Sequence, residues 1–170
     1  TNSTLMAIGA NGVCYKSTTG TTWTALTGLL ASFQTNRVAW SASLGLWFLC
    51  SSGSAQYYTS PDATTWTARI LWGGFGTVYY GVAPFTTAYG DVLIWSHRGL
   101  IGVPLSATAL SAWNWLAGIT IMDLTASPSA AVFVTSAGSI WLKTPTTPWT
   151  SVATGLPAFI STTSCSRNTL

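Results

Sequence analysis

The chain has 170 residues, of which only 5% are charged, and six Lys or Arg residues against three Asp residues give a net charge of +3. No basic cluster is present, so the sequence predicts no binding of nucleic acid. Mean hydropathy is +0.41, yet Gly, Ser or Thr interrupts every apolar run well before about 18 residues, so we also expect no membrane insertion. Aromatic residues make up 13% of the chain, which is more apolar surface than a disordered chain exposes to water, so we expect the chain to fold.

The first half of the chain consists of short apolar or β-branched runs that end at Gly, Ser, Asn or Pro, a pattern typical of β-strands. Asn11-Gly12 is a strong hairpin signal between the first two runs. Ser60-Pro61-Asp62 is a second turn, because Pro presets φ and the Asp carboxylate accepts from backbone N–H groups. The expected strands of this half span 5–10, 13–17, 23–29, 38–40, 46–50, 56–59 and 66–70.

The second half continues in the same way, with tight turns expected at Arg98-Gly99 and Ala137-Gly138. No segment keeps apolar residues at helical spacing with caps at both ends, so the fold class predicted is all-β. The expected strands of this half span 78–82, 92–97, 100–105, 113–116, 121–125, 131–135, 139–143 and 149–152, with a final run at 158–165.

A Ser- and Thr-rich turn followed by Trp recurs at intervals of roughly 40 residues, which is about the length of a propeller blade. The copies lie at 17–23 (STTGTTW), 60–66 (SPDATTW), 106–113 (SATALSAW) and 143–149 (KTPTTPW). A Gly suited to a hairpin precedes each Trp, at Gly12, Gly53, Gly99 and Gly138. The spacing predicts a small β-propeller of about four four-stranded antiparallel blades in one domain.

The blade bounds follow from the strand count. Three blades are expected at 36–72, 77–118 and 120–156, whereas 1–30 supplies only three strands. The unpaired run within 158–170 is expected to complete that first blade and close the ring, which would hide free sheet edges. A longer propeller, or pairing with copies of the same chain, is the alternative. The first residues lack a signal-like segment, so we expect Thr1 to be a processed or trimmed end.

SPDATTW and STTGTTW resemble Asp-box (BNR-type) repeats, and the unit at 36–69 is similar to blades of β-propeller proteins from bacteriophage tails and receptor-binding assemblies. The resemblance implies that the Ser and Asp of each box tie the turn together while the Trp packs between sheets. The structural residues carried over in this way are Ser17, Trp23, Ser60, Asp62, Trp66, Trp113 and Trp149. The match is closest in the second copy, since Thr19 stands where Asp62 does and the third and fourth copies lack both Asp and Gly.

Catalytic and metal sites are not expected. Asp-box propellers include sialidases, whose site uses three Arg and a Tyr helped by Glu, but this chain has no Glu. Arg37, Arg69 and Arg98 fall on different strands or turns and are not expected to converge. His97, the sole histidine, is expected to be a turn residue. The Asp residues are too few for paired-carboxylate chemistry. Cys14, Cys50 and Cys165 are expected to pack as buried free thiols. We therefore expect no enzyme, no metal and no cofactor.

Binding is the function that remains. Several Trp residues lie outside the repeated turns, and some can stack on sugar rings. The loop at 71–76, with Trp72 and Phe75 among three glycines, is the expected ligand site. The resemblance implies a non-enzymatic virion structural or recognition module, a phage tail-fibre or receptor-binding propeller. Its expected partners are other virion proteins, copies of itself and a host-surface glycan. The alternatives are a capsid-surface or fibre building block without a receptor role, a soluble glycan-binding lectin, and a degraded hydrolase.

Overall fold

The computed structural model describes residues 4–8, 13–26, 35–51, 56–70, 79–96, 99–106, 108–115 and 118–157. Within these ranges the chain forms strands β1 to β15 and no helix. Consequently no helix of the described residues has the length and apolarity needed to cross a membrane.

The strands form four antiparallel sheets in chain order. Sheet 1 contains β1 (Leu5–Ile8), β2 (Cys14–Ser17) and β3 (Thr24–Leu26). Sheet 2 contains β4 (Thr35–Ser41), β5 (Leu46–Ser51), β6 (Gln56–Ser60) and β7 (Thr67–Ile70). Sheet 3 contains β8 (Tyr79–Pro84), β9 (Val92–Ser96), β10 (Leu100–Pro104) and β11 (Leu110–Trp115). Sheet 4 contains β12 (Ile121–Ser127), β13 (Ala130–Thr135), β14 (Ile140–Lys143) and β15 (Thr150–Ala153).

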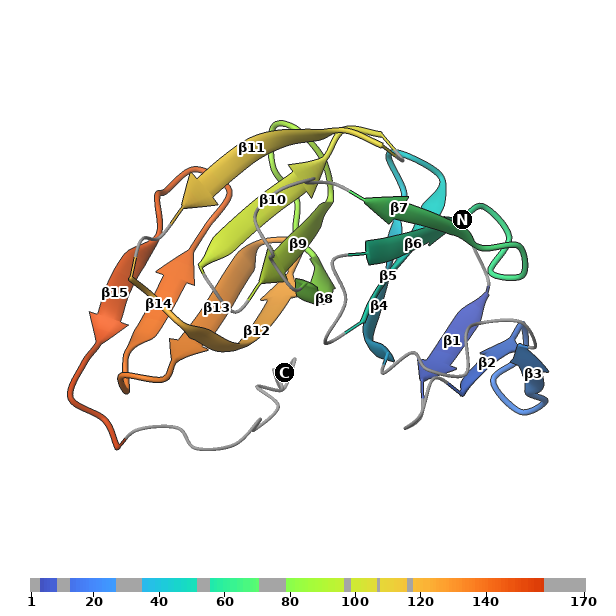
Figure 1. Cartoon of the computed structure of the whole chain (residues 1–170), viewed down its shortest axis with the longest axis horizontal. Coiled ribbons are helices and arrows are strands. Elements are labelled where there is room, and N and C mark those ends of the chain that lie inside the picture. The colour runs from blue at the N-terminus through green and yellow to red at the C-terminus, as the bar shows by residue number, and fades with distance from the viewer. Residues whose placement is uncertain are drawn as a thin grey trace.

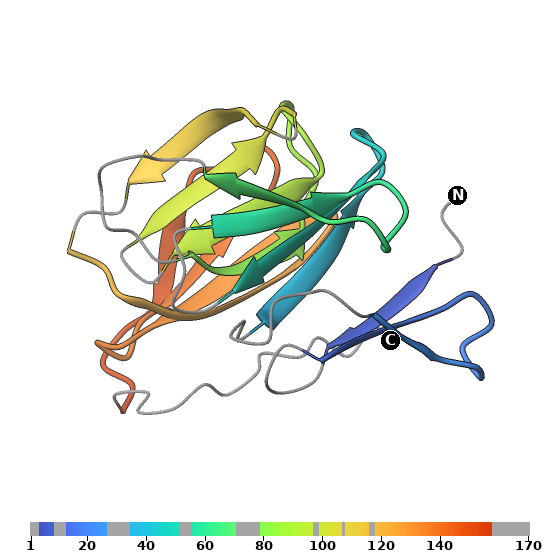
Figure 2. The same ribbon diagram turned by 45° about the vertical axis from the view of Figure 1, so that its right-hand side comes forward.

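The sheets pack face to face in a row that curves into an arc (Figure 1). The first strands of sheets 2, 3 and 4 are neighbours in space, since β4 contacts β8 and β8 contacts β12. Sheets 1 and 4 lie at opposite ends of the arc in both ribbon views (Figures 1 and 2). Every described strand matches a run expected from the sequence, with ends that differ by a few residues. The closing strand expected within 158–170 lies outside the described residues, and the ring closure that it would provide stays a prediction.

The registers reveal which strand sheet 1 lacks. Ser17 pairs with Leu5 at the end of β2, just as Ser60 pairs with Trp47 at the end of β6. In the next pair of strands Tyr15 pairs with Ala25 as Tyr58 pairs with Ala68. Strands β1, β2 and β3 therefore correspond to β5, β6 and β7. The strand that sheet 1 lacks is thus the counterpart of the first strand, β4.

The core lies between the sheets, in three clusters that each join two neighbours. The largest joins sheets 3 and 4 through side chains such as Trp95, Ile101 and Phe133, all 3% exposed or less. A second joins sheets 2 and 3 around Phe48 and Tyr57, and a third joins sheets 1 and 2 around Cys14 and Leu49. Burying one such large apolar side chain stabilises the fold by about 1.5–3 kcal/mol. Face-to-face packing of whole sheets is therefore what holds the arc together.

Candidate binding site

The repeated Ser- and Thr-rich turns are held by side-chain to backbone hydrogen bonds. In the turn at 60–66, both the Thr64 and the Thr65 N–H groups donate to Asp62 Oδ1 at 2.7 Å. The Ser60 hydroxyl donates to the same carboxylate oxygen at 2.9 Å. Donation from Thr65 and Thr64, followed by Ser60, lowers the pKa of Asp62 to about 2, since each bond favours the charged form.

The turn at 17–23 has the same shape without a carboxylate. Thr19 Oγ1 accepts from the N–H groups of Thr21 and Thr22, both at 3.3 Å. Ser17 Oγ accepts from Gly20 N–H at 2.8 Å. Lys16 just before the turn donates to Thr64 Oγ1 and so links sheet 1 to the turn of sheet 2. These geometries give both turns a structural role.

The Trp residues of the turns occupy different environments. Trp66 packs against the cluster between sheets 1 and 2. The ring of Trp149 lies 4.7 Å from that of Phe133, between sheets 3 and 4. Trp23 is 40% exposed and donates its indole N–H to the Gly20 carbonyl. The Trp113 backbone pairs with Gly102 in sheet 3, and its side chain lies outside what the structure describes.

The binding loop expected from the sequence lies outside the described residues. Trp72 and Phe75 both fall within the gap at 71–78, so their role as sugar-stacking residues stays a prediction. His97 and Arg98 fall in another gap. Of the remaining arginines, Arg69 donates from Nε to Thr59 Oγ1, and Arg37 pairs with Asp123, as described below.

A pocket of about 130 Å³ opens between sheets 3 and 4, on the side of the Thr87–Gly90 turn. Its floor is apolar and comes from β9 and β10, and its walls come from the β8–β9 and β14–β15 connections. The lining residues are Thr87, Ala88, Tyr89, Leu93, Ile101, Val103, Lys143, Pro145 and Trp149. The volume is small beside the 300–1,000 Å³ of usual ligand pockets. It suits a single sugar ring or one side chain of a larger ligand.

Polar and aromatic groups meet at this pocket. Tyr89 is 61% exposed and is held in place because Thr87 Oγ1 accepts from the N–H groups of Tyr89 and Gly90 at 3.0 Å. Lys143 Nζ donates to the Thr147 carbonyl at 2.6 Å, and burial lowers the pKa of Lys143. The buried indole N–H of Trp149 has no hydrogen-bond partner among the described residues. The pocket thus combines an exposed aromatic ring with the ammonium group of Lys143 as a donor.

Neither Tyr89 nor Lys143 was predicted from the sequence as a member of a site, whereas Trp149 was expected in a repeated turn. One signal was available: Tyr89 precedes Gly90 in a Thr-rich turn, which is the same kind of feature that singled out Trp72. Lys143 gave no such signal, because its place beside the pocket depends on how sheets 3 and 4 pack.

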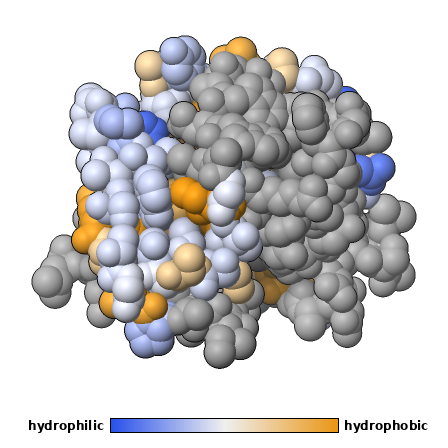
Figure 3. Space-filling model, turned by 60° about the vertical axis from the view of Figure 1, so that its left-hand side comes forward, coloured by the Kyte–Doolittle hydropathy of each residue, from blue (hydrophilic) through white to orange (hydrophobic). Residues whose placement is uncertain are grey.

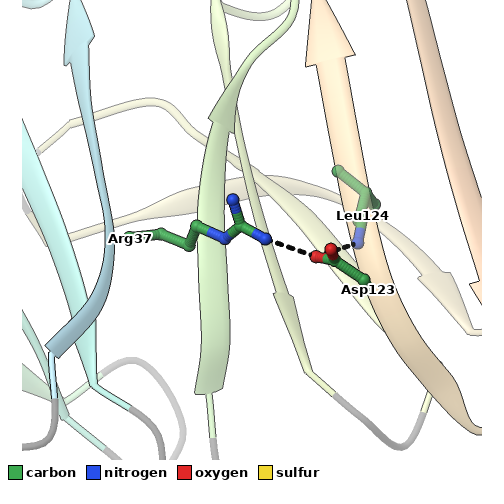
Figure 4. A network of polar contacts seen from close by, with 3 residues as sticks. All are labelled: Arg37, Asp123 and Leu124. Atoms are coloured by element: carbon green, nitrogen blue, oxygen red, sulfur yellow. Dashed lines mark hydrogen bonds and ion pairs between the residues drawn. The ribbon is translucent and has the colours of Figure 1, made fainter. Parts of the chain in front are cut away.

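An ion pair joins sheets 2 and 4 across sheet 3. Arg37 Nη2 lies 2.6 Å from Asp123 Oδ1, and the same oxygen accepts from Leu124 N–H at 2.8 Å (Figure 4). Arg37 and Asp123 each follow a register shift in the first strand of their sheet, as Gly81 does in β8 between them. Asp123 is only 4% exposed in its side chain, so the Arg37 charge offsets the cost of burying it.

A second inter-sheet contact involves Asp91. The Ser41 and Ser43 hydroxyls donate to Asp91 Oδ1, and the Ser43 N–H donates to Oδ2 at 2.9 Å. Burial alone would raise the pKa of Asp91, but hydrogen bonds from Ser41 and Ser43 outweigh it and lower the pKa. This carboxylate therefore fastens the β4–β5 turn of sheet 2 to the start of β9. Asp62, Asp91 and Asp123 thus lie in three separate networks.

Four face-packed antiparallel sheets, with the first strands of sheets 2, 3 and 4 adjacent, define a β-propeller arrangement, and comparison with solved structures confirms the fold. YCF48 bound to D1 peptide matches with a TM-score of 0.60 and 18% identity, over 89% of this chain and 50% of that one. Virginiamycin B lyase from Staphylococcus aureus matches with a TM-score of 0.67 and 10% identity, over 86% of this chain and 50% of that one. A streptogramin B lyase matches with a TM-score of 0.63 and 14% identity, over 83% of this chain and 47% of that one. The chain thus spans about half the length of these structures.

No family model matches the chain, and no curated protein matches its sequence. The expectation that the protein is not an enzyme is wrong on this comparison, because the structures that share its fold include two lyases. The physical reason is that the propeller fold carries both binding and catalytic sites. The absence of Glu and of a sialidase-type site therefore argued only against sialidase chemistry, and not against other enzymes. At these identities the likeness establishes the fold.

Proposed function

We propose that the chain is a recognition module of a virion, of the Asp-box propeller kind found in bacteriophage tail and receptor-binding proteins, and that it binds host-surface glycan. The observation that carries the proposal is the pocket between sheets 3 and 4. The exposed ring of Tyr89 offers a flat apolar surface for the C–H face of a sugar. Lys143 supplies donors for sugar hydroxyls. The hydroxyl-bonded turn at Asp62 supports the Asp-box assignment.

The test is a panel of soluble mono- and oligosaccharides, titrated into wild-type protein and into Tyr89→Ala and Lys143→Met variants. We expect at least one sugar to bind, and its dissociation constant to rise about tenfold in Tyr89→Ala, which equals about 1.4 kcal/mol. Tyr15→Ala is the matched control, because Tyr15 is an exposed Tyr of sheet 1 and should leave monovalent binding unchanged.

Several results would contradict the proposal. Equal binding by wild type and Tyr89→Ala would remove the pocket as the sugar site. Binding lost only on changing Trp72 or Phe75 would place the site in the 71–76 loop. No sugar binding at all would favour the alternative of a fibre or capsid-surface building block. Release of products from the sugars would instead indicate catalysis. Product release should be measured in the same samples, because lyases share this fold.

A second candidate is recognition of an extended peptide. It is favoured by the pocket floor, where Leu93, Ile101 and Val103 form an apolar bed suited to one hydrophobic side chain, and by the D1 peptide bound to YCF48. Titration of a peptide library with aromatic and aliphatic residues separates the two candidates. Peptide binding that Tyr89→Ala weakens, without any sugar binding, would select the peptide.

A further inference from the structure

The turn that forms one wall of the pocket between sheets 3 and 4 is the fourth copy of the repeated turn, and it departs from the other copies. Ser17, Ser60 and Ser106 begin the first three copies, and each hydroxyl accepts from a backbone N–H of its own turn. Lys143 holds that place in the fourth copy, at the end of β14. A long cationic side chain thus stands where the other copies have a small hydroxyl that serves the turn.

The fourth turn is closed without a residue of the usual kind at either position. Thr147 Oγ1 accepts from the Thr144 N–H at 3.0 Å, and the Thr147 N–H donates to the Thr144 carbonyl at 3.4 Å. Pro145 stands where Asp62 does in the second copy. Both residues that depart from the pattern, Lys143 and Pro145, line the pocket. Departures from a repeated pattern that gather at one cavity point to a role in binding rather than in folding.

The ammonium group of Lys143 keeps donors for a ligand. Its Nζ donates to the Thr147 carbonyl at 2.6 Å, which holds the group in place and uses one of its three N–H donors. Within the described ranges no carboxylate pairs with it, since Asp62, Asp91 and Asp123 are bonded elsewhere and the chain has no Glu. A positive charge and two donors therefore remain at the pocket.

Of the described residues that line the pocket, Lys143 alone is charged. The hydroxyl of Thr87 is used within the protein, because it accepts from the Tyr89 and Gly90 N–H groups and donates to the Gly90 carbonyl at 3.0 Å. Figure 3, which brings the side of sheet 4 forward, shows a mostly pale surface with few strongly hydrophilic residues. Burial lowers the pKa of Lys143, and an anion beside the ammonium group would act in the opposite direction.

We propose that the sugar bound at this pocket is acidic: it carries a carboxylate or a sulfate ester that pairs with Lys143 while its ring stacks on Tyr89. The inference rests on the proposed function and names the class of sugar. The pocket of about 130 Å³ holds one ring, so the anionic group and the stacked ring belong to the same sugar residue. A charge-assisted hydrogen bond is roughly twice as strong as one between neutral groups, and the apolar floor strengthens it by excluding water from one side.

The test uses pairs of methyl glycosides that differ only at C6. Methyl β-glucoside is compared with methyl β-glucuronide, and methyl β-galactoside with methyl β-galacturonide, each titrated into the wild-type chain at low and at physiological ionic strength. We expect one uronide to bind about tenfold more tightly than its neutral partner, and this advantage to shrink as salt screens the pairing. The 6-sulfate of the neutral sugar that binds distinguishes a sulfate ester from a carboxylate as the preferred group.

Variants assign the advantage to one side chain. Lys143→Met should abolish the advantage of the uronide and leave binding of the neutral sugar within about twofold, which also shows that the variant is folded. Lys143→Arg keeps the charge and should keep most of the advantage. Lys16→Met is the matched control, because Lys16 precedes the repeated turn of sheet 1 and lines a different pocket, so it should leave the advantage unchanged.

The outcomes separate this inference from the proposed function. Equal binding of each uronide and its neutral partner, with both weakened by Tyr89→Ala, would overturn the acidic assignment and leave the sugar site in place. An advantage of the uronide that persists in Lys143→Met would also overturn it. Absence of binding by every sugar would overturn the inference together with the proposed function.

Discussion

The turns at 17–23 and 60–66 have the same shape but different chemistry. In the second, a carboxylate accepts two backbone bonds of 2.7 Å, and the next residue, Ala63, has a left-handed φ of 56°. In the first, a hydroxyl accepts two bonds of 3.3 Å, and the next residue is Gly20 with a φ of 81°. A strong acceptor thus accompanies a strained residue, and a weak acceptor accompanies a glycine that adopts this φ at little cost.

The largest effect is expected from removing the carboxylate. Asp62→Ala leaves the Thr64 and Thr65 N–H groups without their acceptor and leaves the left-handed φ of Ala63 uncompensated. We expect the melting temperature to fall several times further than in Thr19→Ala, as measured by thermal unfolding. Equal falls in the two variants would show that the turns do not differ in strength.

Acid should weaken the two turns unequally. The pKa of Asp62 is lowered from 3.8 to about 2 in the folded chain, so its contribution is complete above about pH 4 and is lost as pH falls toward 2. The lowered pKa of Asp91 acts in the same direction. We expect denaturant midpoints to fall between pH 5 and 2 on the order of twice as steeply in wild type as in Asp62→Asn. Parallel pH profiles would contradict the assignment.

Exchanging the residues at the left-handed position should have unequal results. Gly20→Ala forces Ala into a φ of 81°, which costs about 1–2 kcal/mol, and the lower entropy of the unfolded chain returns part of this. The new Cβ itself has room, 3.5 Å from Leu5 Cδ1. We expect a net loss of about 1 kcal/mol in the free energy of unfolding.

Ala63→Gly is the matched control. It relieves the left-handed strain but removes a methyl group that is 0% exposed, so these terms should nearly cancel, to within about 1 kcal/mol. Urea unfolding measures both changes. A large gain in Ala63→Gly would mean that the methyl group contributes nothing to the core.

The smallest effect is expected from converting the first turn to the second. Thr19→Asp supplies a carboxylate where the Thr21 and Thr22 N–H groups already point, and Gly20 needs no compensation. The exposed position limits the gain to about 0.5 kcal/mol in the free energy of unfolding. A loss of stability would show that the hydroxyl and the carboxylate do not occupy the same place in the two turns.

Local features made the strands and turns predictable. The run ending at Ser60-Pro61-Asp62 carries its own turn chemistry, and its neighbours along the chain are its partners in the sheet. Contacts between repeats were not predictable in this way. Arg37 and Asp123 are 86 residues apart and meet only because sheets 2 and 4 pack on either side of sheet 3.

The pocket of Tyr89 and Lys143 depends likewise on the packing of sheets 3 and 4, and no local pattern encodes that packing. The enzyme expectation failed for a related reason, since it tested the chain against one catalytic pattern while the fold serves several.

The most direct test of the account is a crystal structure of the 170-residue chain. We expect four sheets packed face to face in chain order, with Arg37 of sheet 2 paired with Asp123 of sheet 4 across sheet 3. A two-layer sandwich, or Arg37 and Asp123 on sheets that do not flank sheet 3, would contradict it.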